Sequence, residues 1–396
     1  MKVKLADNVY WVGAVDWNTR DFHGYTTHRG TTYNAYLVLG EKKALIDTVK
    51  RPFFEEMLGR VREVLDPAEL DYIILNHMEM DHSTSFPEIK AMAPKAEVIV
   101  SRKFGEENFR KIFHGEWELT PVAEGDKVGL GGLTLTFVPI PMLHWPDSMV
   151  TYLVEGGILF SSDAFGQHLA STGRFDDEVD ECALMQEATK YYANILMPLG
   201  NLIPPVVEKL GKLELNLLAT AHGVIWRKNI TGIIQTYLRW AKGEARDRVL
   251  VVYDTMWGNT EKMAQAVLEG IQRGGVESTL YRLSSSDRSD VIAEVLEAKG
   301  LAVGSPTLNN GLFPTVAAFL AYLRGLKPRQ KMGLAFGAYG WGGGAVKKVE
   351  DELREAGVQL VAEGIGVKFT PLPDELERCR LAGQSLAEKM VGKKGG

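Results

Sequence analysis

The sequence predicts two consecutive α/β domains, and three observations support this division. At 396 residues the chain is long enough for two or three domains with sizeable cores. Residues 1–245 contain strands first, and then strands mixed with helices. After the polar linker 243–247, strands and helices alternate, which is typical of a parallel, doubly wound sheet. We therefore expect a domain with a β-sandwich core over residues 1–245 and a doubly wound α/β domain over residues 248–396.

Composition and charge are those of an ordinary globular protein, with 45% apolar and 24% charged residues and a net charge of −6. This balance gives no electrostatic reason to expect nucleic acid or a membrane surface as a partner. No stretch approaches the roughly 20 apolar residues of a membrane span, and the N-terminus lacks a signal-peptide core. The two cysteines, Cys182 and Cys379, lie far apart, which fits a reducing compartment. We expect a cytoplasmic protein.

The first half contains short apolar runs bounded by turn residues. The segment 40–43 predicts a hairpin, Gly156-Gly157 joins two further strands, Pro52 opens a helix, and another helix begins around 83–85. These patterns predict strands at 9–15, 33–39, 44–49, 72–75, 97–101, 133–138, 149–154, 158–161 and 217–221, and helices at 52–65, 103–113 and 230–241.

A cluster of potential metal ligands follows the strand expected at 72–75. Four such residues, His77, Glu79, Asp81 and His82, occur within six positions. An apolar run of this length is typical of a buried strand, so the cluster lies where that strand ends. Two histidines and two carboxylates on one short loop form a wall suited to hard or borderline cations.

Three more polar residues, His144, Asp163 and His222, each come just after an apolar run. A single buried histidine is more often a packed residue than a ligand, but this many positions at strand ends predict one site at one edge of the sandwich. Dinuclear sites hold their ions about 3.5–4 Å apart and need a bridging carboxylate. Asp163 is the natural bridge, because it comes from a different strand than the loop.

The pattern H-x-E-x-D-H followed by a lone His, Asp and His resembles the metallo-β-lactamase fold in its diiron version. Zinc hydrolases of that fold have His where this chain has Glu79. A carboxylate there makes the site harder and moves its preference toward iron or manganese. The resemblance is to flavodiiron proteins, or A-type flavoproteins. It covers the whole chain, including Trp145-Pro146-Asp147-Ser148 and the run 163–168, and implies an αββα sandwich for the first domain.

The resemblance also implies roles for single residues. His77, Glu79 and His144 would hold one iron, Asp81 and His222 the other, and Asp163 would bridge. The counterpart of His82 is a ligand in some members and turned away in others, so both possibilities stay open. His23 resembles a position that lines the substrate pocket beside the irons. The other histidines, expected to be structural, are His28, His114 and His168.

The second half predicts a βα alternation, and its ligand should bind outside the carboxyl ends of the strands. Strands are expected at 249–253, 278–283, 301–304, 332–336 and 360–367, and helices at 260–273, 287–298, 315–323, 345–356 and 374–391.

Three loops at those strand ends are candidates for a cofactor site. The loop 254–260 offers hydroxyls, backbone N–H groups and a helix N-terminus but no lysine, so it suits a single phosphate rather than a Walker-type nucleotide. The glycines of 337–344 allow close approach to a flat ring. The candidate residues are Thr255, Met256, Trp257, Gly258, Asn259, Thr260, Pro306, Thr307, Asn309, Asn310, Gly311, Tyr339, Gly340, Trp341, Gly342 and Gly343.

This half resembles flavodoxin, which implies FMN as its cofactor. A flavodoxin-like module without cofactor, similar to a response regulator, is the alternative. Flavodoxins often have Thr-Gly where this chain has Trp257-Gly258, so the sequence departs from their pattern at Trp257.

The two halves together imply an oxidoreductase. Electrons from a donor would pass through FMN to the diiron site, which would reduce O2 to water, NO to N2O, or both. The resemblance implies a head-to-tail homodimer in which the FMN of one chain faces the irons of the other, with a tetramer as the alternative. The chain carries no G-x-G-x-x-G module for NADH, so we expect a partner as reductant, either rubredoxin or a reduced deazaflavin coenzyme.

Two other functions remain possible at this point. One is a metallo-β-lactamase-fold hydrolase with a regulatory flavodoxin domain, against which Glu79 argues. The other is a redox sensor or electron carrier that uses FMN alone, against which the intact ligand set argues.

Overall fold

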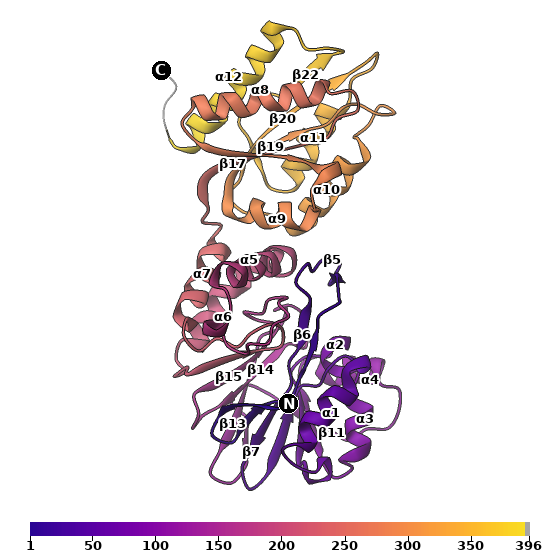
Figure 1. Cartoon of the computed structure of the whole chain (residues 1–396), viewed down its shortest axis with the longest axis vertical. Coiled ribbons are helices and arrows are strands. Elements are labelled where there is room, and N and C mark those ends of the chain that lie inside the picture. Colours follow the sequence, from indigo (N-terminus) through magenta and orange to yellow (C-terminus); the bar gives the residue numbers. More distant parts are fainter. Residues whose placement is uncertain (393–396) are drawn as a thin grey trace. The chain divides into compact units, whose positions relative to one another are not determined.

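The computed structural model describes residues 1–392 and contains two compact units (Figure 1). The first comprises Met1–Tyr191 and Asn201–Leu238. The second comprises Tyr192–Gly200 and the chain from Arg239 onward. The last four residues of the predicted second domain, 393–396, lie outside the described residues.

The first unit is built on two facing sheets. One has seven strands in the order β1-β2-β7-β8-β9-β10-β11, and the other has five in the order β12-β13-β14-β15-β16. The strands of the first sheet are β1 (Val3–Ala6), β2 (Val9–Trp11), β7 (Tyr36–Leu39), β8 (Lys43–Ile46), β9 (Tyr72–Leu75), β10 (Glu97–Ser101) and β11 (Leu119–Val122). Those of the second are β12 (Lys127–Gly129), β13 (Thr134–Pro139), β14 (Met149–Leu153), β15 (Ile158–Ser162) and β16 (Leu217–Thr220).

Side chains alternate across the first sheet and so build two cores. Ile73 and Leu75 of β9 pack in the core that includes Phe54, Met57 and other residues of the helices on the outer face. The intervening Ile74 packs in the core between the two sheets. The helices of the unit are α1 (Phe54–Arg62), α2 (Met80–Ser83), α3 (Phe86–Met92), α4 (Gly105–Ile112), α5 (Glu181–Tyr191), α6 (Ile203–Leu210) and α7 (Ile230–Lys242), of which α7 continues into the second unit.

Two strands predicted as continuous are broken in the structure. The run 9–15 divides into β2 and β3 (Ala14–Asp16), and the run 33–39 into β6 (Thr31–Tyr33) and β7. Here β3 pairs with β6, and β4 (Asp21–Phe22) pairs with β5 (Tyr25–Thr26), as two small separate sheets. Gly13 lies at the first break, where an added Cβ would be 2.2 Å from the carbonyl oxygen of Tyr33. The backbones approach too closely there for any other residue, which a strand pattern does not reveal.

The second unit is a parallel sheet in the order β18-β17-β19-β20-β21, with β22 also paired to β20. Val249, Val251 and Phe336 of the sheet pack against Met263 and Val267 of α8 and against Leu386 of α12. The predicted strand 360–367 is two short strands. The elements are β17 (Arg246–Tyr253), α8 (Asn259–Arg273), β18 (Glu277–Arg282), α9 (Arg288–Glu297), β19 (Ala298–Gly304), α10 (Pro314–Leu326), β20 (Met332–Tyr339), α11 (Ala345–Glu355), β21 (Gln359–Leu360), β22 (Ile365–Lys368) and α12 (Pro373–Met390).

The predicted fold class is therefore confirmed: a β-sandwich domain of the metallo-β-lactamase type followed by a flavodoxin-like domain. Within residues 1–392, none of the helices combines the length and apolar character needed to cross a membrane.

Candidate metal centre and flavin site

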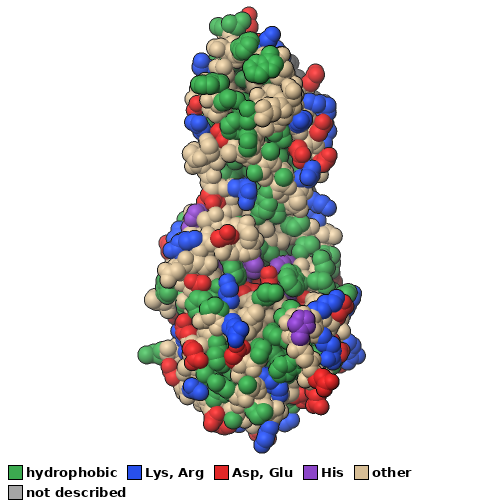
Figure 2. Space-filling view, turned by 90° about the vertical axis from the view of Figure 1, so that its right-hand side faces the viewer, with side chains coloured by type: hydrophobic (Ala, Val, Ile, Leu, Met, Phe, Trp, Pro, Cys, Tyr) green, Lys and Arg blue, Asp and Glu red, His purple; other side chains and the backbone are tan. Residues whose placement is uncertain are grey.

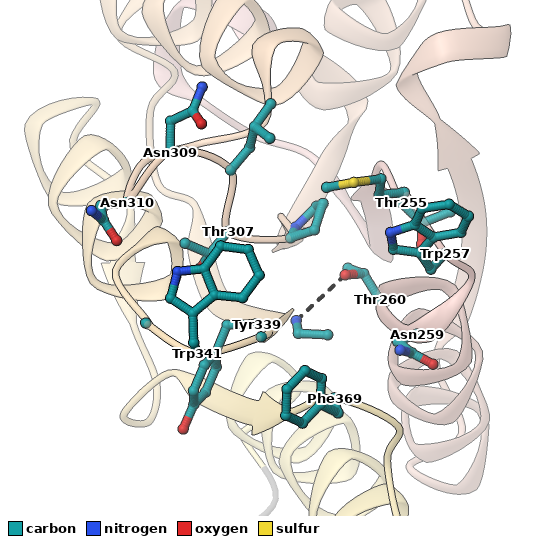
Figure 3. A pocket seen from close by; sticks show the side chains of 16 residues that line it. Thr255, Trp257, Asn259, Thr260, Thr307, Asn309, Asn310, Tyr339, Trp341 and Phe369 are labelled. Atoms are coloured by element: carbon teal, nitrogen blue, oxygen red, sulfur yellow. Dashed lines mark hydrogen bonds between the residues drawn. The ribbon is translucent and has the colours of Figure 1, made fainter.

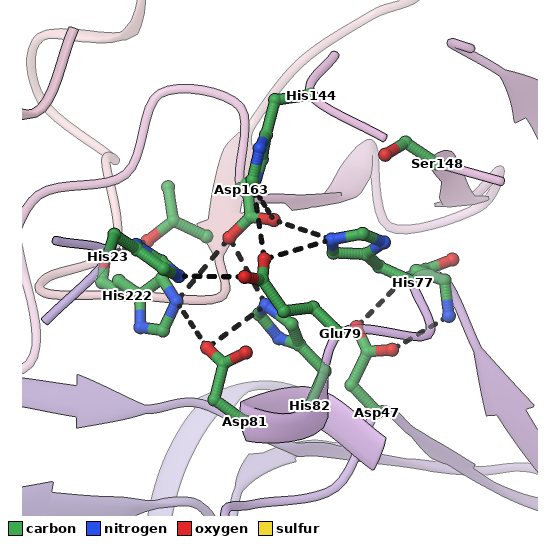
Figure 4. Close-up of polar contacts among 12 residues, drawn as sticks. His23, Asp47, His77, Glu79, Asp81, His82, His144, Ser148, Asp163 and His222 are labelled. Carbon is green, nitrogen blue, oxygen red and sulfur yellow. Dashed lines mark hydrogen bonds and ion pairs between the residues drawn. The ribbon is translucent and has the colours of Figure 1, made fainter. Parts of the chain in front are cut away.

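The ligand cluster lies in the loop that leaves β9 and in the single turn of α2. His77 comes two residues after the end of β9, Glu79 precedes the first residue of α2, and Asp81 and His82 lie within α2. The N–H group of His82 donates to the carbonyl of Glu79 at 3.0 Å. This turn directs Glu79, Asp81 and His82 toward one buried space, where Figure 4 shows them meeting His144, Asp163 and His222.

The side chains form two groups around Asp163. In the first, Nε2 of His77 and Nε2 of His144 lie 3.2 and 3.1 Å from Oε2 of Glu79. Each of these two nitrogens also lies 3.4 Å from Oδ2 of Asp163. Two imidazoles and two carboxylates therefore surround one point.

The second group is built in the same way on the other oxygen of Asp163. Nε2 of His82 and Nε2 of His222 lie 3.3 and 3.0 Å from Oδ2 of Asp81. The same nitrogens lie 3.2 and 3.4 Å from Oδ1 of Asp163. Asp163 thus presents one oxygen to each histidine pair, and His82 points into the second group.

These atoms fit two metal ions. The Nε2 atoms of His82, His144 and His222 and an oxygen each of Asp81 and Asp163 are buried, and within the described residues no hydrogen bond is assigned to them. Donors bound to one ion at about 2.1 Å, and at angles of roughly 90–110°, would lie about 3.0–3.5 Å apart, as they do here. Buried donor atoms this close together are what ligands of a shared ion show.

The electrostatics of the pocket also call for cations. Glu79, Asp81 and Asp163 converge in a buried space, where unpaired carboxylates are costly. Burial alone would lower the pKa of His222, but the carboxylates of Asp163 and Asp81 raise it to about 10. The pKa of His144 is raised to about 9 by Asp163 and Glu79 against the same effect of burial. The site attracts positive charge strongly enough to hold protons where no metal is bound.

The outer nitrogens of two of these histidines have fixed partners. Nδ1 of His77 lies 3.3 Å from Oδ2 of Asp147, and Nδ1 of His222 lies 2.7 Å from the carbonyl oxygen of Thr32. Both contacts place the proton on Nδ1 and leave Nε2 free as a ligand. Asp147 belongs to the segment 145–148 that follows His144, but nothing in the sequence pattern predicts its contact with His77.

His23 lies at the edge of the metal site, with Nε2 3.5 Å from Oε1 of Glu79. Its Nδ1 is 3.3 Å from Nε2 of His168, whose own Nδ1 is 2.7 Å from Oγ1 of Thr31. Burial, reinforced by His222 and His23, holds the pKa of His168 well below its usual range, so this ring is neutral. His168 is a buried structural residue, as expected, but one that also orients His23.

Tyr191 was not among the predicted site residues. Its hydroxyl donates to Oδ1 of Asp163 at 3.1 Å, from the last residue of α5. A tyrosine at a helix end carries no local sign of such a contact.

His28 and His114, predicted to be structural, are exposed on the surface. Figure 2 shows histidine side chains reaching the surface of the first unit among acidic and apolar ones.

The second candidate site is a pocket of about 460 Å³ at the carboxyl ends of β17, β19 and β20 (Figure 3). This volume is within the range of about 300–1,000 Å³ that is usual for ligand sites. Thirteen of the sixteen predicted residues line it. They are Thr255, Met256, Trp257, Asn259, Thr260, Pro306, Thr307, Asn309, Asn310, Tyr339, Gly340, Trp341 and Gly342.

The remaining three predicted residues, Gly258, Gly311 and Gly343, are neighbours of lining residues rather than part of the lining. Leu308 and Ala338 also line the pocket, and both lie within the loops from which the candidate residues were chosen. Phe369, which directly follows β22, lines it without having been predicted. In Figure 3, Trp257 and Trp341 stand on opposite sides of the pocket, and they are 85% and 93% exposed.

The loop before α8 is shaped for an anionic group. Gly258, with φ of +79°, precedes the first turn, and a Cβ added to it would meet nothing within 4 Å. The backbone N–H of Gly258 donates a hydrogen bond to Oγ1 of Thr255 at 3.0 Å. Behind the loop, the buried carboxylate of Asp254 accepts bonds from Ser284 and Thr315. A helix N-terminus, hydroxyls and open space suit a phosphate, and the aromatic rings above suit a flavin, so the pocket fits FMN.

The chain matches two family models, "ODP family beta lactamase" over residues 31–223 and "Flavodoxin" over residues 251–383. It is 48% identical to a "Nitric oxide reductase" of Moorella thermoacetica over 394 residues, which covers 98% of this chain and 99% of that protein. It is 40% identical to the "Anaerobic nitric oxide reductase flavorubredoxin" of Escherichia coli, which covers 98% of this chain and 82% of that protein.

Two solved structures share the complete fold. Rubredoxin oxygen:oxidoreductase from Desulfovibrio gigas superposes with a TM-score of 0.97 at 36% identity, over 99% of both chains. The flavodiiron protein from Giardia intestinalis superposes with a TM-score of 0.96 at 37% identity, over 99% of this chain and 97% of that one. Both structures match this chain over its two units together, so the likeness includes the unit with the candidate metal site and the unit with the candidate flavin site.

Proposed function

This chain belongs to the flavodiiron protein family, and from that premise we propose that it is a reductase of O2, of NO, or of both. Its cofactors are FMN and a non-haem diiron centre. FMN, held by the second unit, would take up electrons from a donor, and the irons, held by the first unit, would supply the site for reduction of O2 to water or of NO to N2O. The observation that carries the proposal is Asp163, whose two oxygens face two different histidine pairs.

The ligands follow from the two groups. His77, Glu79 and His144 would hold one iron, Asp81, His82 and His222 would hold the other, and Asp163 would supply an oxygen to each. The inclusion of His82 is supported by its Nε2, which lies 3.3 Å from Asp81 and 3.2 Å from Asp163. FMN supplies one-electron and two-electron redox chemistry, and the irons supply the binding of the diatomic substrate.

The protein's own residues position these groups. Tyr191 donates to Asp163 and so steadies the bridge. His23, held by His168, lies beside the outer oxygen of Glu79 and is the side chain we assign to the substrate pocket. On the flavin side, the loop 254–260 would hold the phosphate, and residues 306–311 and 339–343 would surround the ring. The relatives include a nitric oxide reductase and a rubredoxin oxygen:oxidoreductase, so the proposal covers both substrates.

Metal analysis combined with a visible spectrum tests the function. Two irons and one FMN per chain, with turnover of O2 or NO by the reduced protein, are expected. Zinc in place of iron would point instead to a hydrolase of the metallo-β-lactamase fold. FMN without any metal would point to an electron carrier.

We further propose that two chains associate head to tail, so that the FMN of one faces the irons of the other. Apolar side chains are exposed near each site in its own unit. Trp257, Trp341 and Phe369 line the flavin pocket, while Met80 and Met142 lie within two residues of metal-site residues. Exposed apolar side chains grouped around functional sites are typical of interaction surfaces.

Mixing two inactive variants tests this arrangement. Asp163→Ala keeps FMN but should lose the irons, and a variant with Gly258→Val keeps the irons but should lose FMN. After subunit exchange, a head-to-tail dimer recovers activity, since one mixed pair unites an intact FMN with an intact metal site. Electron transfer within one chain would leave the mixture inactive.

The reductant is proposed to be rubredoxin or a reduced deazaflavin coenzyme, as the family resemblance suggests. A cytoplasmic location is proposed as well, supported by the unpaired state of Cys182 and Cys379. Stopped-flow reduction of the bound FMN by each donor distinguishes the two reductants, because the physiological one reduces it within the turnover time.

A further inference from the structure

The metal site has two halves, the group His77–Glu79–His144 and the group Asp81–His82–His222. A histidine in each half differs in the partner of its Nδ1 atom, the nitrogen that points away from the site. Nδ1 of His77 faces a carboxylate oxygen of Asp147 at 3.3 Å. Nδ1 of His222 faces the neutral carbonyl of Thr32 at 2.7 Å. A carboxylate behind a histidine raises the donor strength of the opposite nitrogen more than a neutral carbonyl does.

Asp147 is built into the protein as an anion. Its side chain is fully buried, in the segment between His144 and β14. Oδ2 accepts from the backbone N–H of Met78 at 2.7 Å and contacts His77, and Oδ1 accepts from Nδ2 of Asn108 at 2.9 Å. Asn108 lies on α4, so this one carboxylate ties a helix to the ligand loop. A buried carboxylate with three fixed partners keeps a defined position and a defined charge.

Met78 and His77 are consecutive residues of the ligand loop, and both contact the same oxygen of Asp147. This pairing fixes the backbone next to the ligand as well as its ring. By contrast, Thr32 contributes to the second half through uncharged groups only, since its hydroxyl accepts from the N–H of Gly223 at 2.6 Å.

We propose that Asp147 is a positioning residue that makes the His77–Glu79–His144 half the stronger electron donor, so that the two iron positions are unequal. The half backed by Asp147 favours the ferric ion, because added negative charge stabilises the more highly charged state. The half backed by Thr32 is the more easily reduced one. This inference rests on the proposed diiron function and adds which of the two iron positions has the lower reduction potential.

The substitution Asp147→Asn tests the inference, since it removes the charge and keeps the shape. Changes in residues behind a metal ligand typically cost about 10–100-fold in metal affinity. We expect one of the two irons to be retained about tenfold more weakly, and the ferric state to lose more than the ferrous. A tenfold difference between the two states corresponds to about 59 mV for a one-electron couple. A redox titration followed by EPR should therefore show one potential displaced upward by about that amount.

Asp47→Asn is the matched control. Asp47 is also a buried carboxylate near the site, but it accepts from the backbone N–H and Nδ2 of Asn76 and has no hydrogen bond to a ligand histidine. An equal displacement in both variants would overturn the inference, because the effect would then be one of nearby charge alone. An unchanged potential in Asp147→Asn, or loss of both irons together while FMN is retained, would overturn it as well.

Failure of the proposed function would be seen in a different measurement, because the wild-type protein itself would then lack two irons. If Asp147→Asn does not accumulate, Asn108→Ala takes its place. This change removes the bond to Oδ1 and should weaken the retention of one iron, whereas unchanged retention of both would contradict the role of Asp147.

Discussion

The metal pocket and the flavin pocket are lined by different kinds of chemical group. In the first unit, polar and charged side chains from four separate segments converge on two points, and their carboxylates repel one another unless cations are present. In the second unit, loops at three strand ends form an open pocket from hydroxyls, amides, glycines and aromatic rings, with few charges. A metal site is thus specified by side-chain chemistry, whereas a flavin site is specified mainly by backbone shape.

The largest effect is expected from Asp163→Ala, which removes the oxygen shared with each ion. Both irons should be lost, and turnover should fall by more than about a hundredfold. FMN content should stay the same, because the flavin pocket lies entirely in the second unit. Iron analysis and the flavin absorbance of one sample check both statements. Retention of one full iron would show that Asp163 does not bridge.

Glu79→His should have the next largest effect, with iron retention about tenfold lower and zinc uptake higher. Glu79 is the carboxylate of the His77 group, and an imidazole makes that group softer and less anionic. Metal analysis after growth with both ions measures the change. Glu79→Gln is the control, because it removes the charge without adding a nitrogen ligand. Unchanged iron occupancy in Glu79→His would refute this explanation of metal preference.

On the flavin side, Gly258→Ala tests backbone shape. The positive φ of +79° costs a residue with a Cβ about 1–2 kcal/mol, so FMN affinity should fall about 5–30-fold. Gly325→Ala is the control, since this glycine of α10 also has open space but lies within a helix. Flavin fluorescence on dilution measures the affinity. Equal affinity in the two variants would mean that the loop does not need its left-handed turn.

The smallest effect on turnover is expected at Lys331, a buried lysine of the second unit that does not line the flavin pocket. Burial lowers the pKa of Lys331 to about 7, and Nζ donates to the carbonyls of Leu296 and Ala298, which the two N–H groups of a neutral amine satisfy. Above pH 7 the unfolded chain binds one proton more than the folded chain, up to its ordinary pKa of about 10.5.

The free energy of unfolding of the second unit should therefore rise from about pH 7 upward, by about 1 kcal/mol per pH unit. Lys331→Met should flatten this rise and leave turnover unchanged. Urea unfolding at pH 7 and pH 9, followed by release of FMN, provides the measurement. An equally steep rise in the variant would assign the pH dependence to another group.

How well each region could be predicted from the sequence follows from the same contrast. His77, His144, Asp163 and His222 stand after apolar runs, and a polar residue in that place signals a site at a sheet edge. The flavin loops were found for a similar reason, since they follow parallel strands. Fold class and cofactors could be derived at this level.

The residues that could not be predicted act through partners far away in the sequence. Asp147 serves His77, Tyr191 serves Asp163, and His168 serves His23, and no local pattern marks any of these pairs. Phe369 was not predicted because it follows a fourth strand end, β22, whose loop carries no pattern that marks it as part of the pocket. Likewise the break at Gly13 depends on how closely another strand approaches, and that is a property of the assembled sheet.

The placement of Glu79 and Asp81 has a consequence for how far apart the two ions can be. The two residues belong to different halves of the site, yet a single residue, Met80, separates them, and its side chain points outward. Two residues of chain span at most about 7 Å, so peptide geometry limits the separation of the halves. One short stretch of chain therefore supplies a carboxylate to each half of the site. An insertion between Glu79 and Asp81 would displace one of these carboxylates from its half.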